Sequence, residues 1–345
     1  MKKLESSKTK QVTLKDIADS LGISKATVSL CLNNSPLASK KTLAKVMLKI
    51  EQMGYVYNRR AAGLATGKSN TVGLCVHDIT SPYFTHLCAG VDQVLNEQGK
   101  MSFLCNSSES SARQLHFIAT LIEHNADGLL LCPAAGTTTN ELAALFKHRL
   151  PTVLITREIE GFDCDFVGND ERLAMHLATR HLLDLGHTKI AFLGGNYMTS
   201  VAKDRRAGFM DAMRVNGHQS PETLLFDCDN HPSASEKLMS QLLNNPDQYS
   251  AILCFSDHLA FGVISSLLKN GLTPGKEVSV VGCDDIDESG RIYTQLTTIN
   301  IQKYRLGAIA AELLERRLQA PSLPIQRKIL MPELVIRKSS GQYHG

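Results

Sequence analysis

The chain has 345 residues, of which 43% are hydrophobic and 21% charged, and its formal net charge is +3. This length exceeds one ordinary core, so we expect at least two domains, and the composition excludes extended disorder. The charge is unevenly distributed, because residues 1–66 hold ten Lys and two Arg against four acidic residues, a net +8 that leaves −5 for the rest. The first segment is therefore predicted to bind a polyanion.

The N-terminus shows no signal-peptide pattern, and no apolar stretch is long enough to span a membrane. We therefore expect a cytoplasmic, nucleoid-associated protein with no membrane partner. The nine cysteines are scattered singly without a Cys-x-x-Cys pair, which argues against a disulfide framework and a zinc site. We interpret them as reduced thiols that pack as small hydrophobic side chains, and we predict no cofactor and no metal.

Residues 12–34 have the pattern of two short helices joined by a tight turn. Thr13 and Asp16 form a capping box that opens the first helix, and Gly22 permits the turn. Ser24 is a suitable N-cap for the second helix. The residues predicted to face inward are Leu14, Ile17, Ala18, Leu21, Val28 and Leu32.

A third helix is predicted from Ser39 to about Met53, with Gly54 as its C-terminal stop. Its apolar stripe consists of Leu43, Val46, Met47, Ile50 and Met53, and its lysines lie outside that stripe. Three short helices with this turn form a helix-turn-helix, whose second helix enters the major groove of DNA. A plain three-helix bundle with a solvated lysine face is the alternative.

The next segment, YVYNRRAAGLATGKSN, combines a basic dipeptide with small residues and one large apolar side chain, Leu64. This composition is typical of a wedge inserted into the minor groove. Within it, GLATGKS differs from a phosphate-binding loop because three residues, not four, separate its glycines and no strand precedes it. We therefore do not expect nucleotide binding here.

The run from Val12 to Val76 resembles the lactose/galactose-repressor (LacI) family. The resemblance implies a hinge helix that forms when two copies meet on DNA, with Leu64 inserted between base pairs and Ala61 assisting. It also implies phosphate contacts from Thr13, Ser24, Thr27, Ser39, Tyr55 and Asn58, and base contacts from Lys25, Ala26 and Ser29. The complete set of predicted DNA-binding residues is Thr13, Leu14, Ser24, Lys25, Ala26, Thr27, Ser29, Leu30, Asn33, Ser39, Tyr55, Asn58, Ala61 and Leu64.

Leu30 departs from the family pattern, since many relatives carry arginine there. An apolar side chain cannot make the bidentate contact of arginine with guanine, but it can contact a thymine methyl group. We therefore expect a different operator sequence.

From Thr71 onward, short apolar runs alternate with helical stretches: TVGLCV, MSFLCN, GLLLCP, PTVLIT, KIAFLGG, LLFDCD, AILCFS and VSVVGCDD. This alternation predicts parallel sheets covered by helices on both faces, arranged as two doubly wound lobes with a cleft between them. The family shares this architecture with periplasmic sugar-binding proteins. We place the helix-turn-helix head at residues 1–57, the hinge at 58–70 and the two-lobed domain at 71–345, with one lobe at about 71–160 and 300–325 and the other at about 165–295 and 326–340.

Ligands bind beyond the carboxyl ends of such strands, where this chain carries polar and aromatic groups. Asp78, Asp257 and Asp285 are also candidates on this ground, although each aspartate could instead cap the following helix. The family match implies that the arginine of the R-x-A-G element, Arg205, and the aspartate Asp284 hold the effector. The predicted effector-binding residues are His77, Tyr83, Phe84, Thr156, Arg157, Arg205, Ser256 and Asp284.

The segment KYRLGAIAAELLERRLQ predicts a long amphipathic helix that returns to the first lobe, and little sequence follows the last strand pattern. We therefore expect a homodimer that reads a near-palindromic operator. The resemblance implies a repressor controlled by a small molecule, and several segments are most similar to the maltose-regulon branch, which implies a sugar. The alternatives are a solute-binding or sensory protein and an enzyme of sugars or nucleotides on the same fold, but no catalytic residue is predicted.

Overall fold

The computed structural model describes residues 12–32, 35–56, 68–195, 198–244, 249–291 and 293–344. The chain divides into two compact units, Met1–Gly67 and Lys68–Gly345. Among the described helices, none is long and apolar enough to cross a membrane.

The first unit contains three helices, α1 (Leu14–Leu21), α2 (Lys25–Leu32) and α3 (Lys40–Met53). The predicted capping box is confirmed, because the Thr13 backbone N–H donates to Asp16 Oδ2 at 2.8 Å and the Asp16 N–H donates back to Thr13 Oγ1 at 3.3 Å. Gly22 and Gly54 end α1 and α3 in the left-handed conformation, as predicted. The five buried side chains at the centre are Ile17, Ala18, Val28, Cys31 and Val46.

One side chain of the predicted stripe on α3 lies elsewhere. Met47 is 49% exposed, whereas its neighbour Val46 is fully buried. Two short helices cover only a narrow arc of α3, so the stripe that faces the core is narrower than the run of apolar residues suggests.

The structure does not describe four of the predicted DNA-binding residues. They are Asn33 and the hinge residues Asn58, Ala61 and Leu64. The hinge helix therefore stays a prediction.

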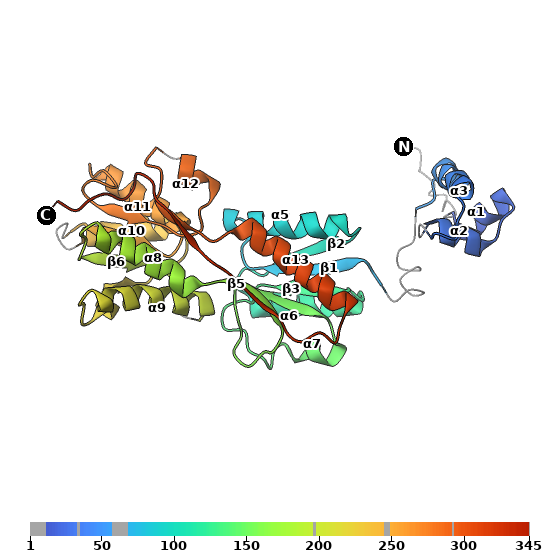
Figure 1. Cartoon of the computed structure of the whole chain (residues 1–345), viewed down its shortest axis with the longest axis horizontal. Helices are drawn as coiled ribbons and strands as arrows, with labels where there is room; N and C mark the ends of the chain where they lie inside the picture. The colour runs from blue at the N-terminus through green and yellow to red at the C-terminus, as the bar shows by residue number, and fades with distance from the viewer. Residues whose placement is uncertain are drawn as a thin grey trace, which may run out of the picture. The chain divides into compact units, whose positions relative to one another are not determined.

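The first lobe of the second unit is built on a parallel sheet in the order β11-β5-β4-β3-β1-β2 (Figure 1). Helices α5 (Pro82–Glu97) and α13 (Lys303–Gln319) cover one face, and α6 (Ser111–Glu123) and α7 (Ala143–His148) cover the other. The strands are β1 (Thr71–Val76), β2 (Met101–Asn106), β3 (Gly128–Leu131), β4 (Thr152–Ile155), β5 (Asp165–Asn169) and β11 (Arg327–Leu330). Since α13 packs on α5, its predicted return to this lobe is confirmed.

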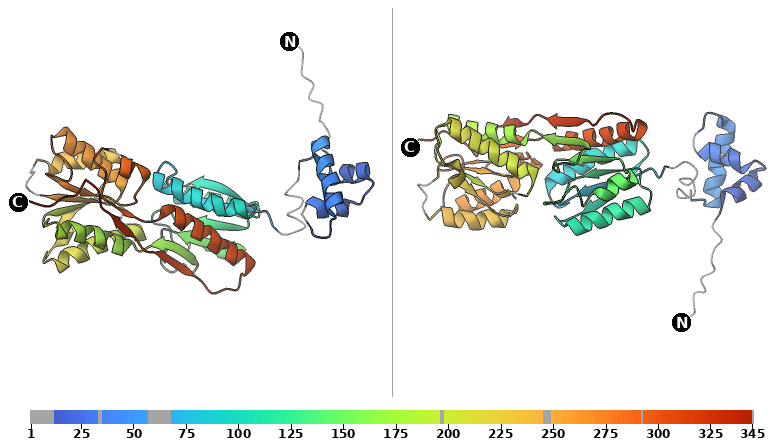
Figure 2. Two further views of the ribbon diagram at one scale, coloured as in Figure 1. Left: turned by 45° about the horizontal axis from the view of Figure 1, so that its top comes forward. Right: turned by 90° about the horizontal axis from the view of Figure 1, so that it is seen from below.

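The second lobe has a parallel sheet in the order β7-β6-β8-β9. Helices α8 (Glu171–Asp184) and α9 (Ser200–Val215) cover one face, and α10 (Pro232–Leu242) and α11 (Asp257–Lys269) cover the other, as Figure 2 shows. The strands are β6 (Ile190–Leu193), β7 (Leu225–Phe226), β8 (Ala251–Cys254) and β9 (Ser279–Val281). The remaining elements are η1 (Pro221–Leu224), α12 (Asp287–Arg291) and the antiparallel pair β10 (Thr298–Asn300) and β12 (Glu333–Val335).

The predicted boundary between the lobes is wrong for two segments. Strands β5 and β11 pair with each other in the first-lobe sheet, whereas we expected residues 165–169 and 327–330 in the second lobe. The cause is a long-range contact, because Arg317 at the end of α13 binds both carboxylate oxygens of Asp165 at 2.8 Å. Arg317 also donates to the carbonyls of Pro321 and Pro324, so the chain turns back along β5.

The chain therefore passes between the lobes three times, after β5, between β10 and α13, and between β11 and β12. Two of these crossings are joined, because Gln302 Nε2 donates to the carbonyl oxygen of Met331 at 2.8 Å. Crossings of this kind, between two separately packed lobes, are points about which such lobes can close on each other.

Candidate functional site

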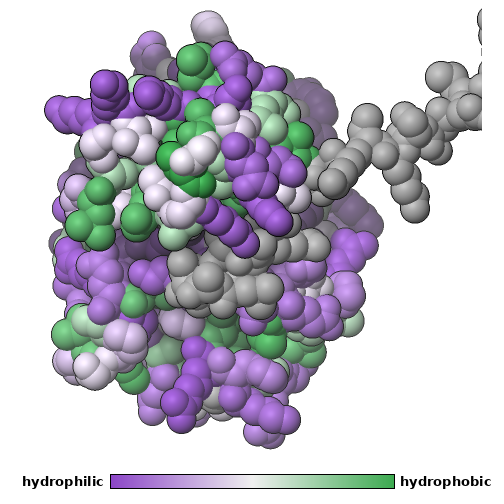
Figure 3. Space-filling view, turned by 90° about the vertical axis from the view of Figure 1, so that its right-hand side faces the viewer, coloured by the Kyte–Doolittle hydropathy of each residue, from purple (hydrophilic) through white to green (hydrophobic). Residues whose placement is uncertain are grey.

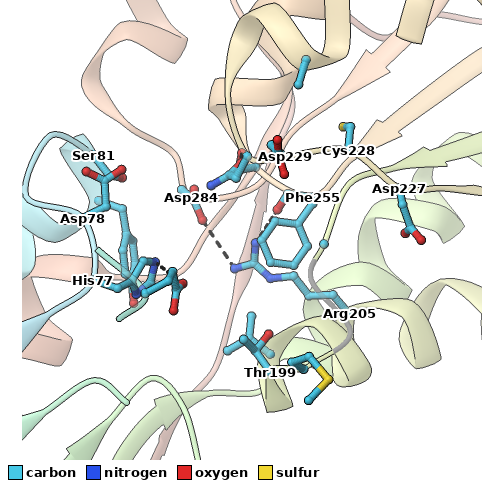
Figure 4. A pocket seen from close by; sticks show the side chains of 18 of the residues that line it. His77, Asp78, Ser81, Thr199, Arg205, Asp227, Cys228, Asp229, Phe255 and Asp284 are labelled. Atoms are coloured by element: carbon cyan, nitrogen blue, oxygen red, sulfur yellow. Dashed lines mark hydrogen bonds and ion pairs between the residues drawn. The ribbon is translucent and has the colours of Figure 1, made fainter. Parts of the chain in front are cut away.

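A cavity of about 1110 Å³ lies between the two lobes, at the carboxyl ends of their strands (Figure 4). The first lobe contributes the segments that follow β1, β2 and β4, and the second contributes those that follow β6, β7, β8 and β9. All eight predicted effector-binding residues line this cavity: His77, Tyr83, Phe84, Thr156, Arg157, Arg205, Ser256 and Asp284. A cavity at this edge of two doubly wound sheets is suited to a small polar ligand.

Arg205 is the central cation on the second-lobe side of the cavity. It projects from α9, is 3% exposed, and its Nε donates to Glu171 Oε2 at 2.6 Å. Its Nη2 lies 3.4 Å from Asp284 Oδ1, and its Nη1 donates to the carbonyl of Phe255. The guanidinium carbon also lies 4.6 Å from the centre of the Phe255 ring. Figure 4 shows the two side chains next to each other. The planar group is therefore held in one orientation by two carboxylates, a carbonyl and a ring.

Gly208 explains why the R-x-A-G element places Arg205 here. A Cβ at position 208 would lie 2.0 Å from the carbonyl oxygen of Arg172 on α8, so only glycine permits this helix contact. The close approach of α8 and α9 brings Glu171, at the start of α8, next to Arg205.

Arg157 is the corresponding cation on the first-lobe side. Its Nη1 and Nη2 donate to the two carboxylate oxygens of Glu109 at 2.9 and 2.8 Å, and Nη1 also donates to the Pro133 carbonyl at 2.9 Å. Nη2 lies 3.3 Å from His77 Nε2, and the His77 ring packs edge-on against Phe84 with centres 4.4 Å apart. These contacts give the first-lobe wall a fixed shape before any ligand enters.

Burial acts on the pKa of several groups that line the cavity, among them Asp284, His77 and Glu109. Burial raises the pKa of Asp284 to about 8 although Arg205 opposes the shift, and burial, with Arg157 adding to it, lowers the pKa of His77 to about 3. Burial also acts to raise the pKa of Glu109, but the hydrogen bonds and charge of Arg157 outweigh it and the pKa is lowered. At neutral pH His77 is therefore an uncharged ring, and Glu109 is a carboxylate.

The backbone is strained at the cavity. Ser108, Glu109, Thr156 and Asp284 all line it and have φ angles of 50°, 59°, 61° and 122°. Residues other than glycine rarely adopt positive φ angles. When they do, they are often found at ligand-binding sites, where the surrounding fold stabilises the strained backbone.

Several lining residues were missed by the sequence reasoning. Glu171 follows β5, a strand that we did not predict, and Glu109 and Asn230 lie in loops without a motif. Asn230 accepts a hydrogen bond from Ser256 Oγ. The strand-end rule itself could have found Glu109, because Glu109 follows the predicted strand β2 by three residues.

Two of the three further aspartate candidates have another role, and only Asp78 lines the cavity. Asp257 is fully buried, and its carboxylate accepts hydrogen bonds from the backbone of Ile286 and from two hydroxyl groups. Asp285 is paired with Arg337 at 2.6 Å. Neither of them belongs to the described lining of the cavity.

The head presents a separate candidate surface for DNA. On α2, Lys25 and Ala26 are exposed and Leu30 is 37% exposed, while Ser29 is half-buried. Ser24 Oγ accepts from the Thr27 N–H at 3.1 Å, which confirms the predicted N-cap. The face drawn in Figure 3 is mostly hydrophilic, and its apolar side chains form small separate groups. The outer face of α2 is therefore accessible, and the Ser24 cap holds the start of the helix.

All nine cysteines are free, five of them buried and four half-buried, as expected for reduced packing residues. Within the described part of the chain, no group of three His, Cys, Asp or Glu side chains is arranged to hold a metal ion.

Comparison with known proteins identifies relatives of both units. A model of the bacterial regulatory proteins of the lacI family matches residues 13–58, and a model of the periplasmic binding proteins and sugar binding domain of the LacI family matches residues 69–328. The HTH-type transcriptional regulator GalR of Escherichia coli (strain K12) is 33% identical over 327 residues, which is 95% of this chain and 95% of the relative.

Solved structures agree with these matches. A LacI family transcriptional regulator from Enterococcus faecium with bound ribose superimposes with a TM-score of 0.72 and 28% identity, over 79% of this chain and 99% of that one. The lac repressor dimer bound to operator and an anti-inducer has the same fold, with a TM-score of 0.85 at 24% identity over 96% of this chain and 99% of that one.

Proposed function

The chain belongs to the LacI family of bacterial regulatory proteins, and we propose that it is a cytoplasmic repressor whose operator affinity is changed by a sugar bound between the lobes. The observation that carries this proposal is the cavity itself, because each lobe contributes an arginine that is held by a carboxylate of the same cavity wall. The proposed function needs two binding sites and no bond-breaking step.

We propose that the ligand acts by changing the closure of the two lobes. A ligand that contacts Arg157 on one lobe and Arg205 on the other binds best to one relative arrangement of the lobes, and so shifts the population toward it. Because the chain crosses between the lobes three times, closure moves all three crossings together. The first lobe begins at β1, directly after the hinge, so its position determines how the two hinges of a dimer are presented to DNA.

We propose that the exposed face of α2 reads the operator, with Lys25, Ala26, Ser29 and Leu30 at base edges. The hinge prediction adds Leu64 as a minor-groove wedge. Two heads of a homodimer would read the two halves of a near-palindromic site, which is why we propose a dimer as the active form.

The sugar is proposed to be of the maltose type. This finer assignment comes from the resemblance of several segments to the maltose-regulon branch of the family. A sugar in general is supported by the related Enterococcus faecium regulator, whose structure holds ribose.

The test is a fluorescence titration of the full-length protein against DNA upstream of its own and neighbouring genes, at fixed salt, with and without maltose and other sugars. We expect sequence-selective binding with a Kd of about 10⁻⁸ M or tighter, and at least about a fivefold change when the correct sugar is present. The proposal would be contradicted if the protein bound all DNA sequences equally and weakly, and if this binding disappeared at higher salt.

Two double variants test whether the exposed face of α2, and not another part of the head, selects the DNA sequence. Lys25→Ala combined with Ser29→Ala should weaken binding to the specific site by at least about tenfold and leave nonspecific binding nearly unchanged. The matched control is Lys45→Ala combined with Ala44→Ser, which changes exposed residues of α3. Equal losses for both pairs would mean that α2 does not select the sequence.

A further inference from the structure

The charges around the inter-lobe cavity are predominantly negative. The described lining residues include six carboxylates, from Asp78, Glu109, Glu171, Asp227, Asp229 and Asp284, but only three cations, from Arg157, Arg205 and Lys237. Asp284 is mostly protonated at neutral pH because burial raises its pKa to about 8, so the other five carboxylates and the three cations give the lining a formal charge of −2. A cleft lined by an excess of one sign repels ligands of that sign.

The two buried arginines do not offset this excess for an incoming anion, because protein carboxylates already occupy them. Both oxygens of Glu109 are bound by Arg157, and Arg205 is bound by Glu171 at 2.6 Å and faces Asp284 at 3.4 Å. An anionic ligand would have to displace one of these carboxylates and leave it buried without its cation, which is costly.

The outer part of the second-lobe wall is also acidic. Asp227 and Asp229 follow β7 and are exposed, and Asp227 is paired with Arg206. Lys237 is exposed on α10, at the rim of the cavity. A single exposed lysine at this rim offers a phosphate group one point charge, without the paired N–H donors of an arginine that has no carboxylate partner.

The remaining lining groups suit a neutral ligand that carries many hydroxyl groups. They are hydroxyls, amides and aromatic rings, among them Ser81, Ser108, Thr199, Asn230, Gln241, Tyr83, Phe84 and Phe255. Carboxylates accept hydrogen bonds from hydroxyl groups, arginine N–H groups donate to their oxygens, and a ring packs on the apolar face of a sugar.

We infer that the effector is an uncharged, hydroxyl-rich molecule, an unphosphorylated sugar, and that the acidic lining of the cavity excludes phosphate esters and sugar acids. This inference rests on the proposed function, since it names the chemical class of the molecule that this cavity takes. It also assigns a selective role to Asp229, whose carboxylate adds to the negative potential at the entrance.

The experiment compares each neutral sugar with its own phosphate ester on the full-length protein. The probe pairs are glucose and glucose 6-phosphate, trehalose and trehalose 6-phosphate, and maltose and maltose 1-phosphate, titrated by calorimetry at matched ionic strength. In the pair that contains the best ligand, the neutral sugar should bind at least about tenfold more tightly than its ester. Tighter or equal binding of the ester would overturn the inference, but it would leave the proposed function standing.

The role of the lining charge is tested with Asp229→Lys. This variant should raise the relative affinity for the phosphate ester by at least about tenfold, whereas Glu123→Lys, on an exposed position of α6 in the first lobe, should not. An unchanged ratio in Asp229→Lys would show that charge at this wall does not select the ligand.

Operator binding is measured in parallel, and it distinguishes the charge inference from the proposed coupling between ligand binding and operator binding. If the neutral sugar binds with the expected preference but operator affinity does not change, the proposed coupling fails while the charge inference is supported.

Discussion

At the scale of single residues, the cavity is organised by arginines whose positive charge is matched inside the protein. Arg205 is almost fully buried, and its partners Glu171 and Asp284 are 5% and 15% exposed at their side chains. Removing one member of such a network leaves a buried charge without its partner, which destabilises the fold. Exposed ion pairs contribute little to the free energy of unfolding. The stability of the second lobe should therefore depend strongly on this one side chain.

Arg205→Ala should lower the free energy of unfolding by about 3–5 kcal/mol, because Glu171 would remain buried without its cation. Chemical denaturation measures the loss. Arg172→Ala is the matched control, since Arg172 lies one helix away, is 61% exposed and pairs with Asp211, so that we expect a loss of about 0–1 kcal/mol. Similar losses in both variants would mean that the buried network is not a stability determinant.

His77 should make the protein sensitive to acid. Burial lowers the pKa of His77 to about 3, below the value of an unfolded histidine, so the folded state disfavours the proton. The stability that this confers is fully present above about pH 6.5 and is lost as the pH falls toward 3, by up to about 1.4 kcal/mol for each pH unit.

Replacing His77 by Asn should flatten the stability profile between about pH 6.5 and 4, measured by urea denaturation at several pH values. His116→Asn, at an exposed position of α6, is the control and should follow the wild-type profile. A variant profile as steep as that of the wild type would show that His77 is not the source of the acid sensitivity.

At the scale of elements, the helix pairs that border the cavity are held by glycines at their closest contacts. Gly208 lets α9 approach α8, and Gly90 and Gly307 let α5 and α13 approach each other, since a Cβ at each would lie 2.0–2.1 Å from a backbone oxygen. These approaches determine where Arg205 and the aromatic residues at the start of α5 lie. The helix pairs are therefore part of the site, although their glycines do not touch a ligand.

Gly208→Ala should destabilise the second lobe by at least about 1–3 kcal/mol, because the added Cβ would force α8 and α9 apart. It should also weaken sugar binding, since Arg205 would lose its alignment with Glu171. Gly290→Ala, where the nearest atom is 3.8 Å from the added Cβ, is the control in α12 and should change the melting temperature little. If Gly208→Ala were as stable as the wild type, the contact between α8 and α9 would not require glycine at this position.

At the scale of the whole molecule, the free edge of the first-lobe sheet is a candidate for the dimer contact. Among the described strands, β2 has only β1 as a neighbour, and its Met101, Phe103 and Leu104 are 61%, 45% and 50% exposed. An exposed apolar edge strand favours association, and natural proteins usually cover such an edge. The proposed second copy would cover it.

Phe103→Glu should convert the proposed dimer to a monomer in light scattering after size exclusion. It should also reduce operator affinity strongly, because one head then binds without its partner. Val215→Glu, at a position of α9 that is 75% exposed, is the control for adding a charge at an exposed apolar site. A Phe103→Glu protein that remains dimeric would place the interface elsewhere.

Caps, turns and apolar periodicity act over a few residues, so they were enough to predict the helices of the head and most strands of the two lobes, whereas the family came from the resemblance of residues 12–76. Thr13 with Asp16, Gly54 and the eight apolar runs are signals of this kind. The eight residues proposed to bind the effector also came from the sequence, and the structure brings all of them to one cavity.

The positions of β5 and β11 and the groups that complete the cavity depend on contacts between residues that are far apart in the sequence. The contact of Arg317 with Asp165 joins positions 152 residues apart, and the pairs Arg157 with Glu109 and Arg205 with Glu171 join loops and helices that no local pattern relates. Such pairings depend on how whole sheets and helices pack, so the physical information is distributed over the fold and is absent from any short stretch of sequence.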